Sequence, residues 1–318
     1  MQDPQSPSSL DRTLSIVIPV YFNEASLPNV FAALREFEPA LAEEKMLLEI
    51  VFIDDGSGDG SFNRLLAFKQ ERPATKVVKL SRNFGAPAAA KAALKFVTGD
   101  CFVFIPADLQ EPLEEILPML AEWRAGHKFV ISARVSRGDP LMTRFLASIY
   151  YVIVKWMVTS NYPKGGIGLM LMDNSLLSLL FNSPKNSNPN MYAFWLGFDP
   201  KILPYHRRNP VHGKSGWTFR KKLKLFVDTI TGFSIMPLRI ISLLGCIVAS
   251  MSFAYALWIF AAGLIQGVAP SGFITIVVLI SFLGGCNLLI LGMIAEYMWR
   301  IADNQSGRPE VVIAETHL

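Results

Sequence analysis

Residues Leu14–Tyr21 read LSIVIPVY, a run of largely β-branched residues typical of a parallel strand buried on both faces. Similar runs follow at Leu48–Ile53, Lys76–Leu80, Cys101–Ile105 and Phe129–Ala133. The segments between them suit helices, at Glu24–Phe37, Gly60–Gln70, Ala86–Val97 and Glu114–Gly126. Strands that alternate with helices predict an α/β fold, a doubly wound domain with a mostly parallel sheet.

A polar cluster follows each of the first four predicted strands. The clusters are Tyr21/Glu24, Asp54/Asp55, Arg82/Asn83 and Asp108/Gln110. Ligands of such sheets bind outside the carboxyl ends of the strands, so we expect these clusters to form one site. The first strand is not followed by GxGxxG, and the chain has no GxxxxGK[ST], so dinucleotide-binding and P-loop interpretations lose their main support.

The side chains of this edge indicate a nucleotide diphosphate held with a metal ion. Asp54 and Asp55 can accept hydrogen bonds from a base N–H or from ribose hydroxyls. Asp108 and Gln110 offer hard oxygen ligands for Mg²⁺ or Mn²⁺, and Arg82 can neutralise phosphate charge. The structural alternative for Asp54-Asp55-Gly56-Ser57 is a capped turn before a helix, and Asp108 has a similar alternative.

The composition indicates that part of the chain lies in lipid. The 318 residues are 51% hydrophobic and 18% charged, whereas soluble globular proteins carry about 25% charged residues. The 22 Phe and 6 Trp exclude intrinsic disorder. A net charge of +4 is too small for a typical nucleic-acid-binding chain, so no nucleic-acid partner is expected. The three cysteines and four histidines show no metal-ligand spacing.

Two uncharged runs near the C-terminus predict a transmembrane hairpin. Ile240–Ile265 and Phe273–Ala295 each exceed the about 20 apolar residues that a span requires, and Gln266–Gly272 supplies turn residues. The alternative is a pair of buried core helices, which normally have a polar face that these runs lack. Lys201–Lys224 carries eight positive charges and no acid, so the positive-inside rule places both ends of the hairpin in the cytoplasm. Met1–Arg12 has no apolar segment of the signal-peptide kind.

Two further segments favour the membrane surface. Trp217–Phe233 has apolar residues at helical spacing and a basic start, typical of an amphipathic helix on an anionic leaflet. Leu141–Val158 is apolar with scattered charges, and it is either an ordinary packed helix or a second interfacial one.

Four runs along the first domain resemble family-2 glycosyltransferases of the GT-A fold. They are IPVYFNE (Ile18–Glu24), IDDGS (Ile53–Ser57), SRNFG (Ser81–Gly85) and ADLQEP (Ala107–Pro112). Gly213–Phe219, Phe233–Arg239 and the two predicted spans resemble the polyisoprenyl-phosphate branch of that family. The resemblance covers nearly the whole chain.

The resemblance implies transfer of a sugar from a nucleotide-sugar to a polyisoprenyl phosphate of the undecaprenyl type, for cell-envelope glycan synthesis or modification. It implies a nucleotide pocket formed by Pro19, Tyr21, Glu24, Asp54 and Asp55. Arg82 is assigned to the same pocket because its guanidinium can neutralise phosphate charge. The resemblance also implies a divalent metal, Mg or Mn, on Asp108 and Gln110. In the basic segment, Arg207, Arg208 and Lys214 would attract the acceptor phosphate.

The expected organisation has six parts and places the protein in a bacterial-type inner membrane with its catalytic domain in the cytoplasm. The parts are a flexible tail (1–12), a GT-A-like nucleotide-sugar-binding domain (13–206), a basic amphipathic juxtamembrane segment (207–238), two transmembrane helices (239–265 and 272–296) and a cytoplasmic tail (300–318). Gly284, Gly285 and Gly292 would allow close helix packing, and thus a homo-oligomer.

The sequence departs from the family pattern at two functional positions, the metal-binding motif and the position of the proposed catalytic base. Pro106-Ala107-Asp108 stands where the family usually has Asp-Ala-Asp, and no carboxylate occurs between Asp139 and Asp173, where the family carries its proposed base. An ionised acceptor phosphate needs no base, so the activity can persist. The alternative is a catalytically impaired partner subunit that binds a nucleotide-sugar or lipid, or a membrane protein that uses the domain to sense nucleotide. The catalytic residue is thus unassigned; Asp173 is a candidate, although Asp173-Asn174-Ser175 also matches a helix N-cap.

Overall fold

The computed structural model describes residues 12–134, 148, 152–156, 163, 167–185, 189–205, 234, 236–266 and 272–318. It divides into two units. The first unit comprises residues 1–232 and 309–318, and the second comprises residues 233–308. The predicted amphipathic segments at 141–158 and 217–233 lie outside the described residues, except for Ser148 and residues 152–156, which are helical.

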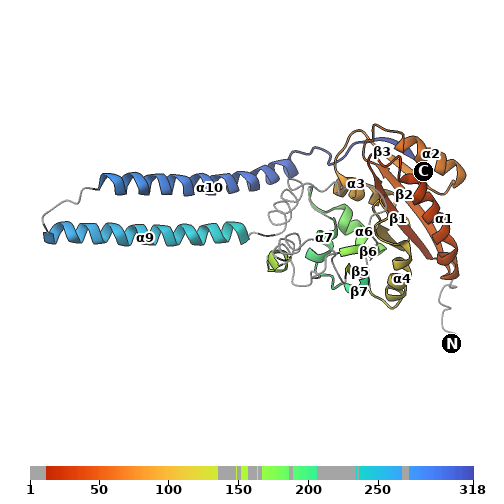
Figure 1. Cartoon of the computed structure of the whole chain (residues 1–318), viewed down its shortest axis with the longest axis horizontal. Coiled ribbons are helices and arrows are strands. Elements are labelled where there is room, and N and C mark those ends of the chain that lie inside the picture. Colours follow the sequence, from red (N-terminus) through yellow and green to blue (C-terminus); the bar gives the residue numbers. More distant parts are fainter. Residues whose placement is uncertain are drawn as a thin grey trace, which may run out of the picture. The chain divides into compact units, whose positions relative to one another are not determined.

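One sheet organises the first unit, and among the described residues it has eight strands in the order β7-β5-β6-β4-β1-β2-β3-β8 (Figure 1). The strands are β1 (Arg12–Val20), β2 (Met46–Asp54), β3 (Lys76–Leu80), β4 (Cys101–Phe104), β5 (Phe129–Arg134), β6 (Ile167–Asp173), β7 (Lys201–Tyr205) and β8 (Ile313–His317). Strands β4, β1, β2 and β3 are mutually parallel, and β5 is parallel to β7. Strand β6 runs antiparallel to both β4 and β5, and β8 runs antiparallel to β3.

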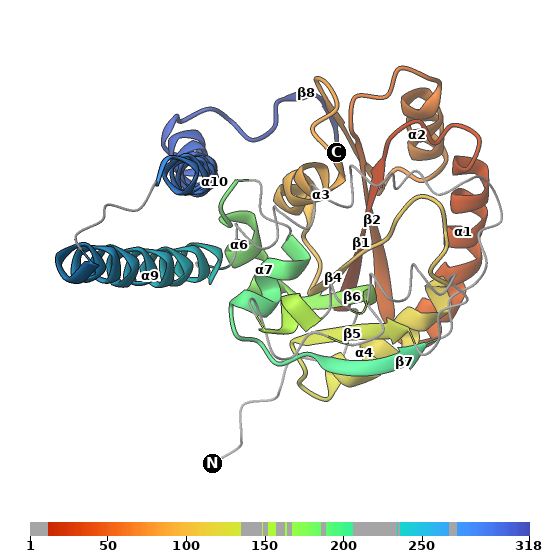
Figure 2. The ribbon, with the colours of Figure 1, turned by 60° about the vertical axis from the view of Figure 1, so that its left-hand side comes forward.

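Helices cover both faces of this sheet (Figure 2). One face packs against α1 (Leu27–Glu43), α2 (Ser61–Glu71) and α4 (Ile116–Arg124), which follows the short 3₁₀ turn Leu113–Glu115. The other face packs against α3 (Ala86–Ala93), α6 (Leu177–Phe181) and α7 (Pro189–Trp195). Alternate residues of β1 point to the two cores: Ile16 and Ile18 lie in the first, and Val17 lies in the second. The predicted doubly wound α/β fold is confirmed.

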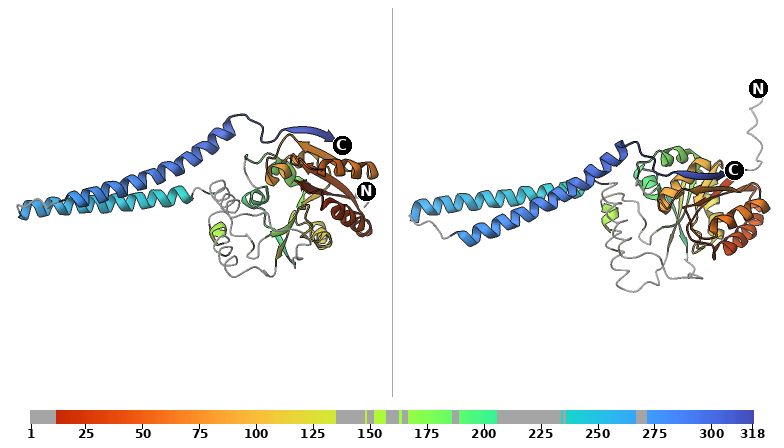
Figure 3. Two further views of the ribbon diagram at one scale, coloured as in Figure 1. Left: turned by 45° about the horizontal axis from the view of Figure 1, so that its top comes forward. Right: turned by 90° about the horizontal axis from the view of Figure 1, so that it is seen from above.

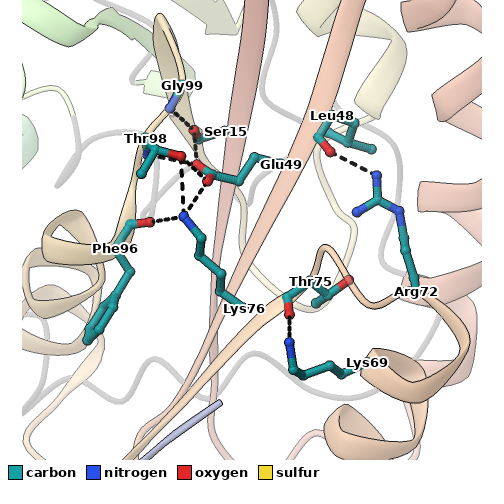
Figure 4. A network of polar contacts seen from close by, with 10 residues as sticks. All are labelled: Ser15, Leu48, Glu49, Lys69, Arg72, Thr75, Lys76, Phe96, Thr98 and Gly99. Carbon is teal, nitrogen blue, oxygen red and sulfur yellow. Dashed lines mark hydrogen bonds and ion pairs between the residues drawn. The ribbon is translucent and has the colours of Figure 1, made fainter. Parts of the chain in front are cut away.

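A buried polar network holds the strands together near the edge where β1 and β3 begin (Figure 4). Glu49 of β2 is 8% exposed. Its carboxylate accepts hydrogen bonds from the hydroxyls of Ser15 and Thr98, from the Thr98 N–H at 2.9 Å and from Lys76 Nζ at 2.5 Å. Burial acts to raise the pKa of Glu49, but these contacts outweigh it and hold the pKa below its ordinary value. The network thus stabilises the ionised carboxylate inside the sheet unit.

The second unit is a pair of long apolar helices, α9 (Met236–Gln266) and α10 (Phe273–Gln305), which lie side by side (Figure 3). Mean hydropathy is 1.7 over Met236–Tyr255 and 1.4 over Phe282–Gln305, and neither stretch is buried within the protein. Both helices are therefore long and apolar enough to cross a membrane, by length and composition. They contain nearly all of the two spans expected at 239–265 and 272–296.

The chain leaves α10 and returns to the sheet. Residues 300–318 were expected to form a tail, but Ile313–His317 pairs with β3 as an edge strand. A strand of five residues that lies far along the chain from its partner has too short a pattern to be recognised in the sequence.

Candidate functional site

The carboxyl ends of four adjacent strands form one edge of the sheet. In the register of the parallel strands, Val20 of β1 lies beside Asp54 of β2, and Asp54 lies beside Lys79 of β3. Strand β4 ends beside Val17 of β1. Each of the four polar clusters begins within four residues of one of these strand ends, so all four follow the same edge of the sheet. Figure 2 shows the strands β1 to β4 that end there. Half-buried Pro19, which has no N–H, lies beyond the last residue that β1 pairs with β4.

Asp55 fastens the loop that follows β3. Its carboxylate oxygens accept hydrogen bonds from the N–H groups of Phe84 at 2.7 Å and Gly85 at 2.9 Å. Its own N–H donates to the carbonyl of Val20 at 2.8 Å, which ties the same residue to β1. Burial raises the pKa of Asp55, although the two backbone donors oppose the shift. Because both oxygens are engaged, the geometry gives Asp55 a positioning role for the Arg82 loop.

Gly56 allows the loops after β2 and β3 to touch. Its φ of +69° lies in the left-handed region, and a Cβ at this position would lie 2.5 Å from the carbonyl carbon of Arg82 and 2.6 Å from its Cα. Since backbone atoms cannot rotate away, only glycine fits this contact without displacement. The close approach sets the position of Arg82 relative to the Asp54-Asp55 turn.

Asp54 carries an unsatisfied buried oxygen. The residue is 0% exposed, and its Oδ2 accepts a hydrogen bond from the Ser57 N–H at 3.1 Å. Its Oδ1 has no hydrogen-bond partner in the described part of the chain. Burial is the largest influence and raises the pKa of this carboxyl. A buried acceptor without a partner is costly, so a donor would be favourable here, and a ligand could supply one only if the loops over this side chain move.

The segment after β1 is built on the turn after β2. Phe22, at φ +52°, donates its N–H to Ser57 Oγ at 3.1 Å, and its ring meets that of Tyr21 edge to face at 4.8 Å. Tyr21 is 47% exposed, so its ring is accessible to a ligand. Glu24 instead accepts the N–H of Gly60 at 2.9 Å, at the start of α2, and lies 3.4 Å from Arg64. Its carboxylate therefore holds the two loops together in this structure.

Two charged side chains at this edge face solvent. Asp108 follows β4 and is exposed, and its Oδ1 accepts the N–H of half-buried Gln110 at 3.3 Å. Exposed Arg82 lies with its guanidinium 4.1 Å from the ring centre of Phe84. Among the described residues, no group of three or more His, Cys, Asp or Glu is arranged to hold a metal. Any metal here would rest on few protein ligands.

Asp173 lies at the opposite edge of the sheet. Strand β6 is antiparallel to β4, and Asp173 pairs with Cys101, the first residue of β4. Its carboxylate accepts the Ser175 N–H at 2.9 Å as a helix N-cap and the Trp123 Nε1–H at 2.8 Å. Burial acts to raise its pKa, but these bonds lower it. Together with Arg12, Asp100 and Trp123, it lines a cavity of about 450 Å³. The N-cap alternative is confirmed, and this position does not support a catalytic role.

The predicted acceptor-phosphate residues Arg207, Arg208 and Lys214 lie outside the described residues.

Several residues that shape the site were not predicted individually from the sequence. Ser57 contacts both Asp54 and Phe22, and Ser61 Oγ accepts the Asn23 N–H at 2.9 Å. The signal available for Ser57 was its spacing of three residues after Asp54, which is typical of a local side-chain turn.

Residues 15–179 match the family described as Glycosyl transferase family 2. An uncharacterized glycosyltransferase of Synechocystis sp. is 32% identical over 305 residues, which covers 95% of this chain and 95% of the relative. The bactoprenol glucosyl transferase of Shigella phage SfX is 32% identical over 302 residues, 94% of this chain and 98% of the relative.

Among solved structures, a mannosyltransferase from Pyrobaculum calidifontis in complex with GDP-Man and Mn²⁺ aligns with 94% of this chain and 77% of its own. Its TM-score is 0.49 at 18% identity. The family match spans more than half of the 318 residues, and the Synechocystis and phage relatives extend over nearly the full length. On this evidence the chain belongs to glycosyl transferase family 2 and is a glycosyltransferase.

Proposed function

We propose that this glycosyltransferase moves a sugar from a nucleotide-sugar donor to a polyisoprenyl phosphate of the undecaprenyl class. The observation that carries the proposal is the extent of similarity to the bactoprenol glucosyl transferases. It runs over 94% of this chain at 32% identity, and so includes the apolar helices as well as the sheet. The chain thus combines a family-2 domain with helices suited to the membrane that holds such an acceptor.

The donor would bind along the carboxyl edge of β1 to β4. The accessible ring of Tyr21, two residues after Pro19, offers a surface for the base, and Oδ1 of Asp54 would accept a base N–H once the loops over this buried side chain move. Arg82, held in place by the loop that Asp55 fastens, would neutralise the diphosphate. Glu24 would act by keeping the Tyr21 segment against the turn after β2.

Asp108 and Gln110 would hold the divalent metal, Mg or Mn. One carboxylate and one amide oxygen fit such an ion because it prefers hard oxygen ligands, keeps several waters and takes the remaining ligands from phosphate. The exposed position of Asp108 leaves room for that hydration. When bound, the metal would neutralise the charge that develops on the departing nucleoside diphosphate.

The acceptor supplies its own nucleophile. A phosphate monoester is ionised near neutral pH, so an acceptor oxygen can attack the anomeric carbon without a protein base. The new bond between that oxygen and the anomeric carbon forms as the bond to the diphosphate breaks. The nucleoside diphosphate leaves with the electron pair, and a single displacement of this kind inverts the anomeric configuration. The absence of a carboxylate between Asp139 and Asp173 is compatible with this route.

We also propose that this chain is an integral protein of a bacterial-type inner membrane. Helices α9 and α10 would span it, with both ends and the sheet unit in the cytoplasm, because Lys201–Lys224 carries eight positive charges and the turn between the helices carries none. Arg207, Arg208 and Lys214 are proposed to attract the acceptor phosphate. A homo-oligomer is proposed through Gly284, Gly285 and Gly292 of α10, where a Cβ would meet no described atom within 4 Å.

Transfer of radiolabelled sugar tests the proposal directly. Membranes that contain the full chain would be incubated with undecaprenyl phosphate, Mn²⁺ and each of a panel of nucleotide-sugars. We expect a labelled lipid product with one donor or a few. If nucleotide binds and no donor gives a lipid product, the chain is instead an impaired partner subunit, the alternative that Pro106 raises by replacing a metal-binding carboxylate.

A further inference from the structure

The last ten residues of the chain belong to the sheet unit. Residues 309–318 follow α10 after the three residues Ser306–Arg308 and include β8. Val311 and Ile313 pack against the apolar core on the α3 face of the sheet. We refer to Pro309–Leu318 as the C-terminal strap, because it joins the last apolar helix covalently to the sheet.

The strap contacts α3 through a buried ion pair. Glu310 Oε2 lies 2.7 Å from Lys91 Nζ, and the two side chains are 19% and 8% exposed. Lys91 also donates to the carbonyl of Ser183 and, at 3.4 Å, to that of Pro184, so its ammonium joins the strap to the end of α6. Removing the Glu310 carboxylate would leave the buried Lys91 charge with carbonyl acceptors alone, so this ion pair ties α3 to the strap.

The same strap holds the opposite end of the loop that carries Arg82. The carbonyl of Val312 accepts the N–H of Ser81 at 2.9 Å, at the first residue after β3. The loop Ser81–Gly85 then leads into α3, whose first residue is Ala86. Thus the strap is attached at the first residue of this loop and again, at Lys91, in the helix that follows it.

We propose that the C-terminal strap is a positioning element of the donor site, with Glu310 and Lys91 as its principal residues. The loop Ser81–Gly85 is fixed on its inner side by Asp55, at its first residue by the strap, and beyond its last residue through α3, which the strap holds at Lys91. Arg82 reaches the diphosphate only while both fixations hold. This inference rests on the proposed function, since it assigns the strap to the binding of the nucleotide-sugar donor.

The test compares Glu310→Gln with a matched variant of the same strap, Glu315→Gln. Glu315 is 46% exposed in its side chain and forms a 3.3 Å ion pair with Lys79, but it is not part of the Lys91 contact. Hydrogen exchange of the full chain in detergent would follow the Phe84 and Gly85 amides. Calorimetry would measure binding of UDP and of GDP, each with Mn²⁺. In the transfer assay, KM would be measured separately for donor and for lipid phosphate.

In Glu310→Gln we expect faster exchange at Phe84 and Gly85, nucleotide binding weaker by about tenfold, and a donor KM raised by a similar factor with the acceptor KM unchanged. Glu315→Gln should leave all three unchanged. Unchanged exchange in the loop would overturn the inference, as would faster exchange spread evenly over β1 and β2, which indicates a general loss of stability. Failure of the native chain to bind either nucleotide would contradict the proposed function; the exchange at the two amides alone would then decide whether the strap fixes the loop.

Discussion

Replacing Gly56 with alanine probes the contact on which the site depends. The substitution places a Cβ at a residue with φ +69°, which costs about 1–2 kcal/mol for any residue that has one. It also places that Cβ 2.5 Å from the carbonyl carbon of Arg82, 2.6 Å from its Cα and 2.9 Å from its oxygen. Overpacking of this kind typically costs a further 1–3 kcal/mol, roughly, because the loop must move. We therefore expect Gly56→Ala to lower the free energy of unfolding by about 2–5 kcal/mol.

Gly197→Ala is the matched control. Gly197 also has a positive φ, +84°, but a Cβ there would meet no described atom within 4 Å. It should cost only the backbone strain, about 1–2 kcal/mol. Thermal unfolding of the full chain would compare the two, and each kcal/mol corresponds to about 2–4 °C in the midpoint for a unit of this size. Gly56→Ala should also bind nucleoside diphosphate more weakly. Equal midpoints for the two variants would refute the contact between the Gly56 turn and the Arg82 backbone.

Three further substitutions separate the roles of the acidic residues. Asp108→Ala should lower metal-dependent transfer by about 100-fold or more, because the carboxylate ligand of the diphosphate-bound ion is lost; unchanged transfer across a Mn²⁺ titration would exclude Asp108 as a ligand. Asp173→Ala should cost about 1 kcal/mol of stability through loss of the N-cap, with transfer intact; loss of transfer in a folded variant would restore it as a catalytic candidate. Glu49→Gln should cost about 3 kcal/mol near pH 7, because half-buried Lys76 loses the charged partner that Glu49 supplies from inside the sheet. Since the pKa of Glu49 is depressed in the fold, the native advantage is present above about pH 4.3 and disappears as the pH falls through the folded pKa; a constant difference in unfolding free energy down to about pH 3 would contradict this.

The strands that the sequence identified share a local signal. Lys76–Leu80 coincides with β3, and Leu14–Tyr21 and Leu48–Ile53 differ from β1 and β2 only at their ends. These strands lie in the middle of the sheet, where burial on both faces requires continuous apolar runs. The polar residues after them could be assigned to one edge for the same reason, because parallel strands end on the same side.

Strands β6, β7 and β8 depend on contacts that a local pattern does not encode. Strand β7 is an edge strand of five residues, and β8 pairs with β3 across most of the chain length. Strand β6 runs antiparallel to its neighbours, and that direction decides where Asp173 lies. A sequence pattern can locate a carboxylate at a strand end, but the end is on the site edge only if the strand is parallel to the others.

The division of work between Asp54 and Asp55 also required the structure. The two carboxylates are adjacent in sequence and were assigned the same ligand-binding role. In the fold, both carboxylate oxygens of Asp55 accept hydrogen bonds from the Phe84 and Gly85 N–H groups, whereas Oδ1 of Asp54 is buried without a described partner. Adjacent residues at a strand end point in different directions, so they contact different loops.

The most direct test of the central claim is a structure of the full chain in a lipid bilayer with UDP or GDP and Mn²⁺. The account predicts the diphosphate at the carboxyl ends of β1 to β4, with the ion on Asp108 and with Arg82 against a phosphate. A nucleotide bound at another edge of the sheet, or an ion held away from Asp108, would contradict it.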